Sequence, residues 1–325
     1  MKLPRRSFLH LAAGVAALPA ASRIARAESY PTRPVHIVVG FTAGGPFDIT
    51  ARLIGQSLSA QLGQPFIIDN RPGAGTNIAT EFVVGAPADG YTLSLVGLPN
   101  AINASLYDNL NFDFIRDIAP VASIVGVPNV MLVNPAFPAK TIPEFIAYAK
   151  ANPGKINMAS AGEGTFSHLC GELFKLATGI DLVHVPYKGG APALTDVLGG
   201  HVQLIFSGVS VSLGYIKSGK LRALGVTTSA RLELLPDIPT VGESVPGYEA
   251  NGWEGLGAPK NTPADVIDRL NGAVKTALAD PKIKASFSDL GNVPMPMTPA
   301  EFGKLIAGDT EKWRKVIRAA NIKAD

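Results

Sequence analysis

The fold is decided by residues 35–96, which read VHIVVGFTAGGPFDITARLIGQSLSAQLGQPFIIDNRPGAGTNIATEFVVGAPADGYTLSLV. Short β-branched runs alternate here with longer segments whose apolar residues recur at helical spacing. The pattern predicts strands and helices in the order β-α-β-α-β, at 35–39, 48–62, 66–68, 77–85 and 91–96. Such alternation is typical of a parallel sheet whose crossover connections are helices.

A second α/β series starts at Thr141, which has the spacing to Glu144 of a capping box that opens a helix. Its strands are expected, with helices between them, near 156–159, 182–185, 202–206 and 221–227. A strand at 253–258 follows, and capping boxes at 262–265 and 298–301 open two further helices. The C-terminal segment therefore returns after the second series is complete.

This order predicts two α/β lobes between which the chain crosses twice, near Val130 and near Asn251. Residues 28–130 and 252–325 would form lobe 1, and residues 131–251 would form lobe 2. Two crossings make a hinge. The single cysteine, Cys170, allows no internal disulfide, so a hydrophobic core must hold the fold, and 46% hydrophobic composition is sufficient for one.

The N-terminus has the three parts of a secretory signal peptide at residues 1–27. Lys2, Arg5 and Arg6 precede the apolar run 11–18, and Ala25-Arg26-Ala27 has the form of a cleavage site. Residues 5–9 resemble the twin-arginine export motif, although Pro4 and His10 depart from it. A membrane anchor is the alternative, but the apolar run falls well short of the roughly 20 residues that span a bilayer. We expect cleavage after Ala27 and a periplasmic mature protein.

Cleavage would also change the charge of the protein. The whole chain carries 29 Lys+Arg and 26 Asp+Glu, whereas the mature chain keeps 24 basic residues against 26 acidic ones. The apparent basicity belongs mostly to the signal peptide. Composition therefore gives no reason to expect a nucleic-acid partner, which requires a concentrated positive field.

Glycine-rich loops at strand-to-helix junctions are the candidate binding sites, because free backbone N–H groups and the helix dipole favour an anion there. In lobe 1 the candidate loop is Phe41-Thr42-Ala43-Gly44-Gly45-Pro46-Phe47-Asp48, with Asp48 interpreted as a helix cap. In lobe 2 it is Ser160-Ala161-Gly162-Glu163-Gly164-Thr165-Phe166-Ser167-His168. Nearby, Tyr187 and Lys188 offer a hydroxyl and a cation. Two such helix N-termini facing one cleft would hold the two ends of a diacid.

The sequence motifs of common enzyme classes are mostly absent or incomplete in this chain. Residues 214–220 fit a phosphate-loop pattern, but Leu221 stands where a hydroxyl should bind magnesium, and a helix precedes the loop. The mature histidines show no metal-ligand spacing along the chain. Ser167 and His168 are adjacent on a helix and point in different directions. We therefore predict no catalytic residues, no metal and no cofactor.

Many short motifs, in order and over nearly the whole mature chain, resemble the Bug family of periplasmic solute receptors of tripartite tricarboxylate transporters. The motifs are the 41–48 loop with residues 49–52, then 62–65, 70–75, 88–93, 149–155, 162–168, 185–189, 219–224 and 235–241. The resemblance implies a type II periplasmic-binding-protein (Venus-flytrap) fold whose two loops grip carboxylates. Family members often carry an acid or amide at the position of Ser207, so the resemblance implies a carboxylate ligand without selecting one family ligand.

The sequence and the resemblance together predict a ligand site, whose members are Phe41, Thr42, Ala43, Gly44, Gly45, Asp48, Asn100, Ser160, Gly162, Gly164, Thr165, His168, Tyr187, Lys188 and Ser207. The predicted protein is a monomeric, non-enzymatic receptor that delivers a dicarboxylate, tricarboxylate, aromatic acid or acidic amino acid to membrane permease subunits. A sensing module for a membrane kinase is one alternative. A secreted hydrolase or lyase on the same scaffold is another.

Overall fold

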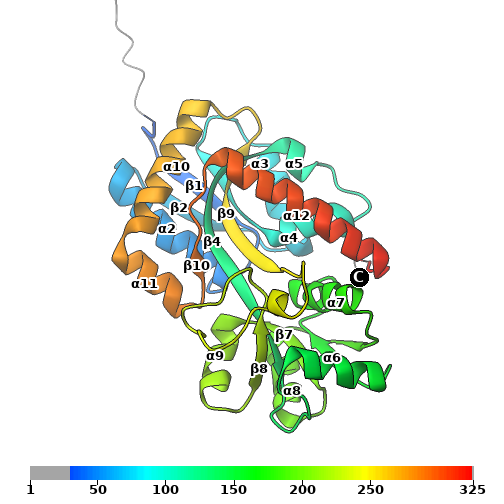
Figure 1. Ribbon diagram of the computed structural model, residues 1–325. Coiled ribbons are helices and arrows are strands. Elements are labelled where there is room, and N and C mark those ends of the chain that lie inside the picture. The colour runs from blue at the N-terminus through cyan, green and yellow to red at the C-terminus, as the bar shows by residue number, and fades with distance from the viewer. Residues whose placement is uncertain (1–29, 324–325) are drawn as a thin grey trace, which may run out of the picture.

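The computed structural model describes residues 30–323 and shows an upper and a lower lobe that are joined by long strands (Figure 1). The predicted signal peptide, its cleavage site and its twin-arginine motif lie outside the described residues. Within residues 30–323, no helix is long and apolar enough to cross a membrane.

Lobe 1, the upper lobe of Figure 1, has the predicted β-α-β-α-β core and adds the C-terminal helices to it. Its elements are β1 (Val35–Val39), α2 (Pro46–Leu62), β2 (Phe66–Asn70), the 3-10 turn η1 (Ala74–Thr76), α3 (Asn77–Val84), β3 (Thr92–Gly97), α4 (Leu98–Leu106), α5 (Phe114–Asp117), β9 (Asn251–Pro259), α10 (Ala264–Ala279), α11 (Pro281–Asp289), β10 (Val293–Pro294) and α12 (Pro299–Ala319). Strands β2, β1 and β3 are parallel, and β9 joins β3 in the antiparallel sense.

Lobe 2, the lower lobe, repeats the α/β alternation. Its elements are α6 (Ile142–Ala151), β5 (Asn157–Ser160), α7 (Phe166–Thr178), β6 (Val183–Pro186), α8 (Gly190–Gly199), β7 (Leu204–Gly208), α9 (Val209–Lys217), β8 (Arg222–Val226) and the 3-10 turn η2 (Val241–Glu243). Strand β5 pairs in parallel with both β6 and β7. The carboxyl ends of these strands carry the loops that start α7, α8 and α9.

One long strand, β4 (Ile118–Val133), belongs to both lobes. Its first part, as far as Pro128, pairs with β9, and its last part, from Asn129, pairs with β7 and β8. The chain returns to lobe 1 beside it, where the Ala250 N–H donates to the Thr227 carbonyl over 2.8 Å. Two adjacent connections therefore link the lobes.

The predicted helix caps have different outcomes. Thr298 and Glu301 form the full capping box that opens α12. Thr141 caps α6, but the Glu144 carboxylate accepts the N–H of Lys140 instead of that of the cap. The box predicted at 262–265 is wrong: the Thr262 hydroxyl donates to the Pro259 carbonyl, and α10 starts without a side-chain cap.

Buried apolar side chains form three clusters, of which one reaches into both lobes. That cluster contains Trp253 and Trp313 from lobe 1 together with Phe145 and Phe174 from lobe 2. The Trp253 indole N–H donates to the Asp309 carboxylate over 2.8 Å, which satisfies the polar end of this buried ring. The shared cluster packs side chains of the two lobes against one another.

Close packing between β9 and α12 predicts a large effect of a single methyl group at Gly255. A Cβ there would lie 2.5 Å from the Ala122 carbonyl oxygen and 2.5 Å from the Phe302 ring. Because a backbone atom cannot yield easily, we expect Gly255→Ala to lower the free energy of unfolding by about 1–3 kcal/mol. Urea unfolding would measure this. Gly272→Ala, in the exposed middle of α10 with open space around it, should instead stabilise by about 0.5–1 kcal/mol. Equal effects of the two changes would contradict the packing argument.

Candidate functional site

The first candidate loop joins β1 to α2 and is closed by Asp48. Gly45 is the N-cap of α2, so Asp48, predicted as the cap, lies instead in the first turn. Its buried carboxylate accepts the Gly44 N–H over 2.9 Å and the Arg52 guanidinium over 2.8 and 3.0 Å. These bonds, chiefly that of Arg52, hold the pKa of the Asp48 carboxyl below its usual value in spite of burial. The Gly44 N–H is therefore already bonded within the loop.

Aromatic side chains form the floor of this loop. The Phe41 and Phe47 ring centroids are 4.4 Å apart. Phe47 also covers Gly97 at the end of β3, where an added Cβ would lie 2.6 Å from the ring. Thr42, Ala43 and Gly44 are exposed above them. The sequence pattern did not single out Phe47, because only the fold brings it over Gly97.

Asn100, a predicted ligand residue, has a structural role in lobe 1. It is buried, and its side-chain oxygen accepts the Gly97 N–H over 2.8 Å at the start of α4. Its amide group donates to the hydroxyls of Thr76 and Thr80 over 3.0 and 2.9 Å. These bonds attach α4 to α3 and occupy the polar atoms that a ligand would need. We leave Asn100 out of the proposed site.

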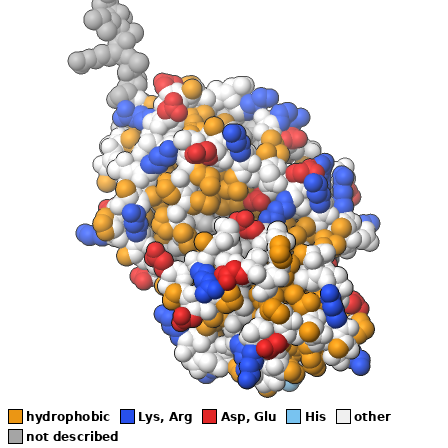
Figure 2. Space-filling view, viewed as in Figure 1, with side chains coloured by type: hydrophobic (Ala, Val, Ile, Leu, Met, Phe, Trp, Pro, Cys, Tyr) orange, Lys and Arg blue, Asp and Glu red, His pale blue; other side chains and the backbone are white. Residues whose placement is uncertain are grey.

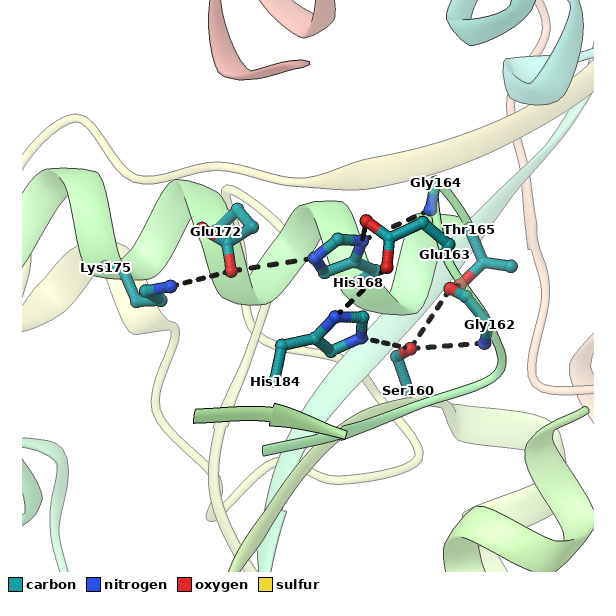
Figure 3. Close-up of polar contacts among 9 residues, drawn as sticks. All are labelled: Ser160, Gly162, Glu163, Gly164, Thr165, His168, Glu172, Lys175 and His184. Atoms are coloured by element: carbon teal, nitrogen blue, oxygen red, sulfur yellow. Dashed lines mark hydrogen bonds and ion pairs between the residues drawn. The ribbon is translucent and has the colours of Figure 1, made fainter. Parts of the chain in front are cut away.

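The second candidate loop joins β5 to α7 and is tied together by short-range hydrogen bonds (Figure 3). Ser160, which is fully buried, accepts the Gly162 N–H over 3.1 Å, and the Thr165 hydroxyl donates to the Gly162 carbonyl over 2.7 Å. Gly162 and Gly164 have φ values of 136° and 66°, which L side chains rarely adopt. Glycine is therefore strongly favoured at both positions.

Two histidines pack behind this loop and connect it to a chain of charged groups (Figure 3). The His168 and His184 rings stack with centroids 3.6 Å apart and planes 5° from parallel. His168 lies 3.6 Å from Glu172, which in turn pairs with Lys175 over 2.9 Å. Burial, and then the neighbouring His168, lower the pKa of His184 to about 4, so this ring is neutral at physiological pH. Burial opposes ionisation of Glu172, but contacts with His168 and Lys175 outweigh it and lower its pKa.

Of the remaining predicted residues, Tyr187 and Lys188 follow β6, and Ser207 lies on β7. The Tyr187 hydroxyl donates to the Asp196 carboxylate over 2.6 Å, and burial together with this bond raises the pKa of Tyr187 to about 12. Lys188 is exposed and forms no ion pair within residues 30–323. Ser207 is buried on β7 opposite Val130 of β4. Lys188 is thus the free cation of this set.

The structure gathers the predicted residues into one group in each lobe. The second loop touches lobe 1, since a Cβ on Gly164 would lie 2.8 Å from the Leu106 side chain of α4. No hydrogen bond joins the two loops among residues 30–323. Two cavities, of about 700 and 590 Å³, lie elsewhere: one between residues 228–234 and 284–295, the other between residues 105–109 and 317–323. Neither is lined by a predicted ligand residue.

Comparison with known proteins identifies the family. The match to the tripartite tricarboxylate transporter family receptors spans residues 50–322, so the chain belongs to this family. A Bordetella pertussis protein named BugT is 36% identical over 300 residues, which cover 91% of this chain and 92% of BugT. The predicted membership of the Bug receptors is confirmed. Members of this family are solute-binding receptors.

Solved structures confirm the predicted type II periplasmic-binding-protein fold with its two lobes and hinge. The periplasmic binding protein BugD is 36% identical with a TM-score of 0.73, covering 91% of this chain and 100% of BugD. The R. palustris protein Rpa4515, solved with adipate, is 36% identical with a TM-score of 0.76, covering 90% and 99%. MatC from Rhodopseudomonas palustris, solved with bound malate, is 32% identical with a TM-score of 0.73, covering 89% and 100%.

Proposed function

We propose that this chain captures a small carboxylate, foremost a dicarboxylate, between its lobes and delivers it to the permease of a tripartite tricarboxylate-type transporter. The observation that carries the proposal is the position of the β5–α7 loop, whose Gly164 abuts Leu106 of the opposite lobe. Anion-binding groups at that junction would change their surroundings when the lobes move. The adipate and malate bound by the two structural relatives support a dicarboxylate.

The structure changes which backbone N–H groups we assign to carboxylate binding. The N–H groups of Gly44 and Gly164 are engaged by Asp48 and His168, over 2.9 and 3.2 Å. First-turn N–H groups of a helix lack an intrahelical acceptor, and the helix dipole favours an anion beside them. We therefore assign the carboxylate contacts to the first turns of α2 and α7. Five residues supply these N–H groups: Phe47 and Asp48 on α2, and Phe166, Ser167 and His168 on α7.

Polar side chains of the same loops complete the proposed site. Thr42 and Ala43 are exposed on the first loop, and Thr165 caps α7 without a side-chain bond to the helix. Lys188, exposed after β6, adds the positive charge that attracts an anion. Tyr187 and Ser207 shape the lobe 2 wall. Asp48 and His168 act as positioning residues because each holds a loop N–H.

Figure 2 shows basic and acidic side chains interspersed over the visible face, without a large area of one sign.

We propose export through the signal peptide of residues 1–27, cleavage after Ala27, and a monomeric receptor in the periplasm. The lobe boundaries near Val130 and Asn251 belong to the same proposal. They are supported by the change of partner along β4 at Pro128 and Asn129.

A thermal-shift titration of the mature chain, residues 28–325, tests the function. Adipate or malate at 100 times its Kd should stabilise the protein by about 2.7 kcal/mol, which appears as a rise in Tm. Dimethyl adipate, which has the same carbon chain without charge, should give no shift. NMR of the mixture should show the ligand unchanged after prolonged incubation. Absence of a shift across dicarboxylates, tricarboxylates, aromatic acids and acidic amino acids would contradict the proposal, and consumption of a ligand would favour an enzyme.

A further inference from the structure

Three potential metal ligands from separate parts of lobe 2 converge behind the β5–α7 loop (Figure 3). Glu163 lies in the loop, His168 on α7, and His184 on β6. One donor atom from each residue can be chosen so that all three lie within 4.8 Å of one another. The chain spacing of the histidines did not reveal this cluster.

Glu163 and the Gly164 N–H both lie near Nδ1 of His168, while Nδ1 of His184 faces Glu163. Nδ1 of His168 accepts the Gly164 N–H over 3.2 Å, and Nε2 of the same ring faces Glu172. Nε2 of His184 lies 2.7 Å from the Ser160 hydroxyl. Because that hydroxyl can donate to the Gly162 carbonyl over 3.1 Å, it can accept from Nε2–H. In this arrangement Nδ1 of His184 is the acceptor nitrogen that faces the Glu163 carboxylate, whereas Nδ1 of His168 becomes available when the Gly164 N–H leaves it.

The distances within the cluster suit a shared metal ion better than direct hydrogen bonds. Oε1 of Glu163 lies 3.5 Å from Nδ1 of His168, and Oε2 of Glu163 lies 3.4 Å from Nδ1 of His184. Charge-assisted hydrogen bonds are about 2.7–2.9 Å long. Two ligand atoms on one tetrahedral zinc ion are roughly 3.4 Å apart, because zinc–nitrogen and zinc–oxygen bonds are about 2.0–2.2 Å.

The outer nitrogen of each ring faces a group of the kind that metal-binding histidines bond, at 2.7 Å for His184 and at 3.6 Å for His168. Glu172, held by Lys175, faces Nε2 of His168, and Ser160 faces Nε2 of His184. Such outer contacts fix the tautomer and raise the basicity of the coordinating nitrogen. Glu163 keeps 29% of its side-chain surface exposed, which leaves a route for the ion and a position for water.

We propose that Glu163, His168 and His184 form a binding site for one divalent transition-metal ion of the Zn²⁺ type. Two imidazoles and one carboxylate form a common zinc ligand set, whereas Mg²⁺ and Ca²⁺ prefer oxygen ligands alone. The ion would tilt the stacked rings apart, since parallel planes cannot both aim a lone pair at one atom. It would also replace the Gly164 N–H on Nδ1 of His168. Metal binding therefore alters the backbone of the Gly162–Thr165 loop.

Isothermal titration of ZnCl₂ into the tag-free, EDTA-treated mature chain tests the site without any carboxylate ligand. The expected result is one equivalent bound with a rise in Tm, while MgCl₂ gives neither. Loss of an outer-shell partner alone weakens metal binding about 10–100-fold, so Glu163→Gln should weaken Zn²⁺ binding by at least about 100-fold. His184→Phe retains a ring for stacking but removes both nitrogens, and should do the same.

The other two mature histidines provide the matched control. His36 and His201 are exposed, and the double variant His36→Asn/His201→Asn should bind Zn²⁺ as the wild type does. Amide NMR should show a Zn²⁺-dependent change at Gly164 that a surface histidine would not cause. Three outcomes would overturn the proposal: no stoichiometric binding by the wild type, unchanged affinity in folded Glu163→Gln, or loss of binding in the double control. Melting curves of the metal-free variants separate lost binding from lost folding.

Discussion

The Glu254→Gln variant is expected to be about 3 kcal/mol more stable than the wild type at pH 8 and equally stable at pH 4. Glu254 lies on β9 with 1% of its surface exposed, and one of its carboxylate oxygens has no hydrogen-bond partner within the described residues. Burial raises the pKa of this carboxyl to about 7, although the neighbouring Thr50 hydroxyl lowers it slightly. Ionisation therefore leaves a poorly compensated charge in the core of lobe 1.

The sign of the pH dependence follows from proton binding. An ordinary glutamate has a pKa of 4.5, so between pH 4.5 and about 7 the folded protein keeps a proton that the unfolded chain has lost. The free energy of unfolding then falls as the pH rises through this range and is flat above it. Each pKa unit corresponds to 1.36 kcal/mol, which gives a total of about 3 kcal/mol.

Urea unfolding at pH values from 4 to 9 measures the difference between the wild type and Glu254→Gln. The neutral amide removes the titration, so the gap between the two curves should open between about pH 4.5 and 7. Glu233→Gln, at an exposed loop position, is the matched control and should track the wild type. A gap that does not change with pH would contradict the assignment of the buried charge to Glu254.

Local sequence signals predicted the first five strands and helices of the fold, because residues that typically start or end such elements mark their boundaries. Helix α2 ends at Gly63, which has a φ of 73°, with Pro65 beyond it. Strand β4 was missed because Pro120 and Pro128 interrupt it, and its register shifts twice against β9. Helix α4 was missed because its capping signal is an Asn at the third position rather than a Ser or Thr before the helix. Neither pattern is a recognised local signature.

The chemistry of the site depended more on tertiary pairing than on local pattern. His184 lies opposite Met158 in the β5–β6 ladder, and α7 folds back from the end of β5 to place His168 over it. The two histidines are sixteen positions apart in the chain, a spacing that fits no single helix or turn. The glycine-rich loops were visible in the sequence because φ values such as those of Gly162 and Gly164 strongly favour glycine. Which N–H groups are already bonded could be known only from the folded loops.

Gly164→Val is expected to weaken carboxylate binding by roughly 100-fold or more while the protein stays folded. Gly164 has a φ of 66°, where a residue with a side chain costs about 1–2 kcal/mol, so the loop would relax and binding would have to restore it. The new Cβ would also lie 2.8 Å from Leu106, and such overpacking against the opposite lobe costs about 1–3 kcal/mol. Each 1.4 kcal/mol corresponds to a tenfold change in Kd.

Gly179→Val separates these two effects, because Gly179 also has a φ of 66°, at the other end of α7, with nothing within 4 Å. Both variants share the backbone strain, and we expect comparable losses of Tm from it. Only Gly164→Val adds a side chain at the junction of the lobes, so only this variant should lose affinity for adipate or malate in isothermal titration. Wild-type affinity in both variants would place the ligand away from the β5–α7 loop. An equal loss of affinity in both variants would show that strain in α7, rather than contact with Leu106, controls binding.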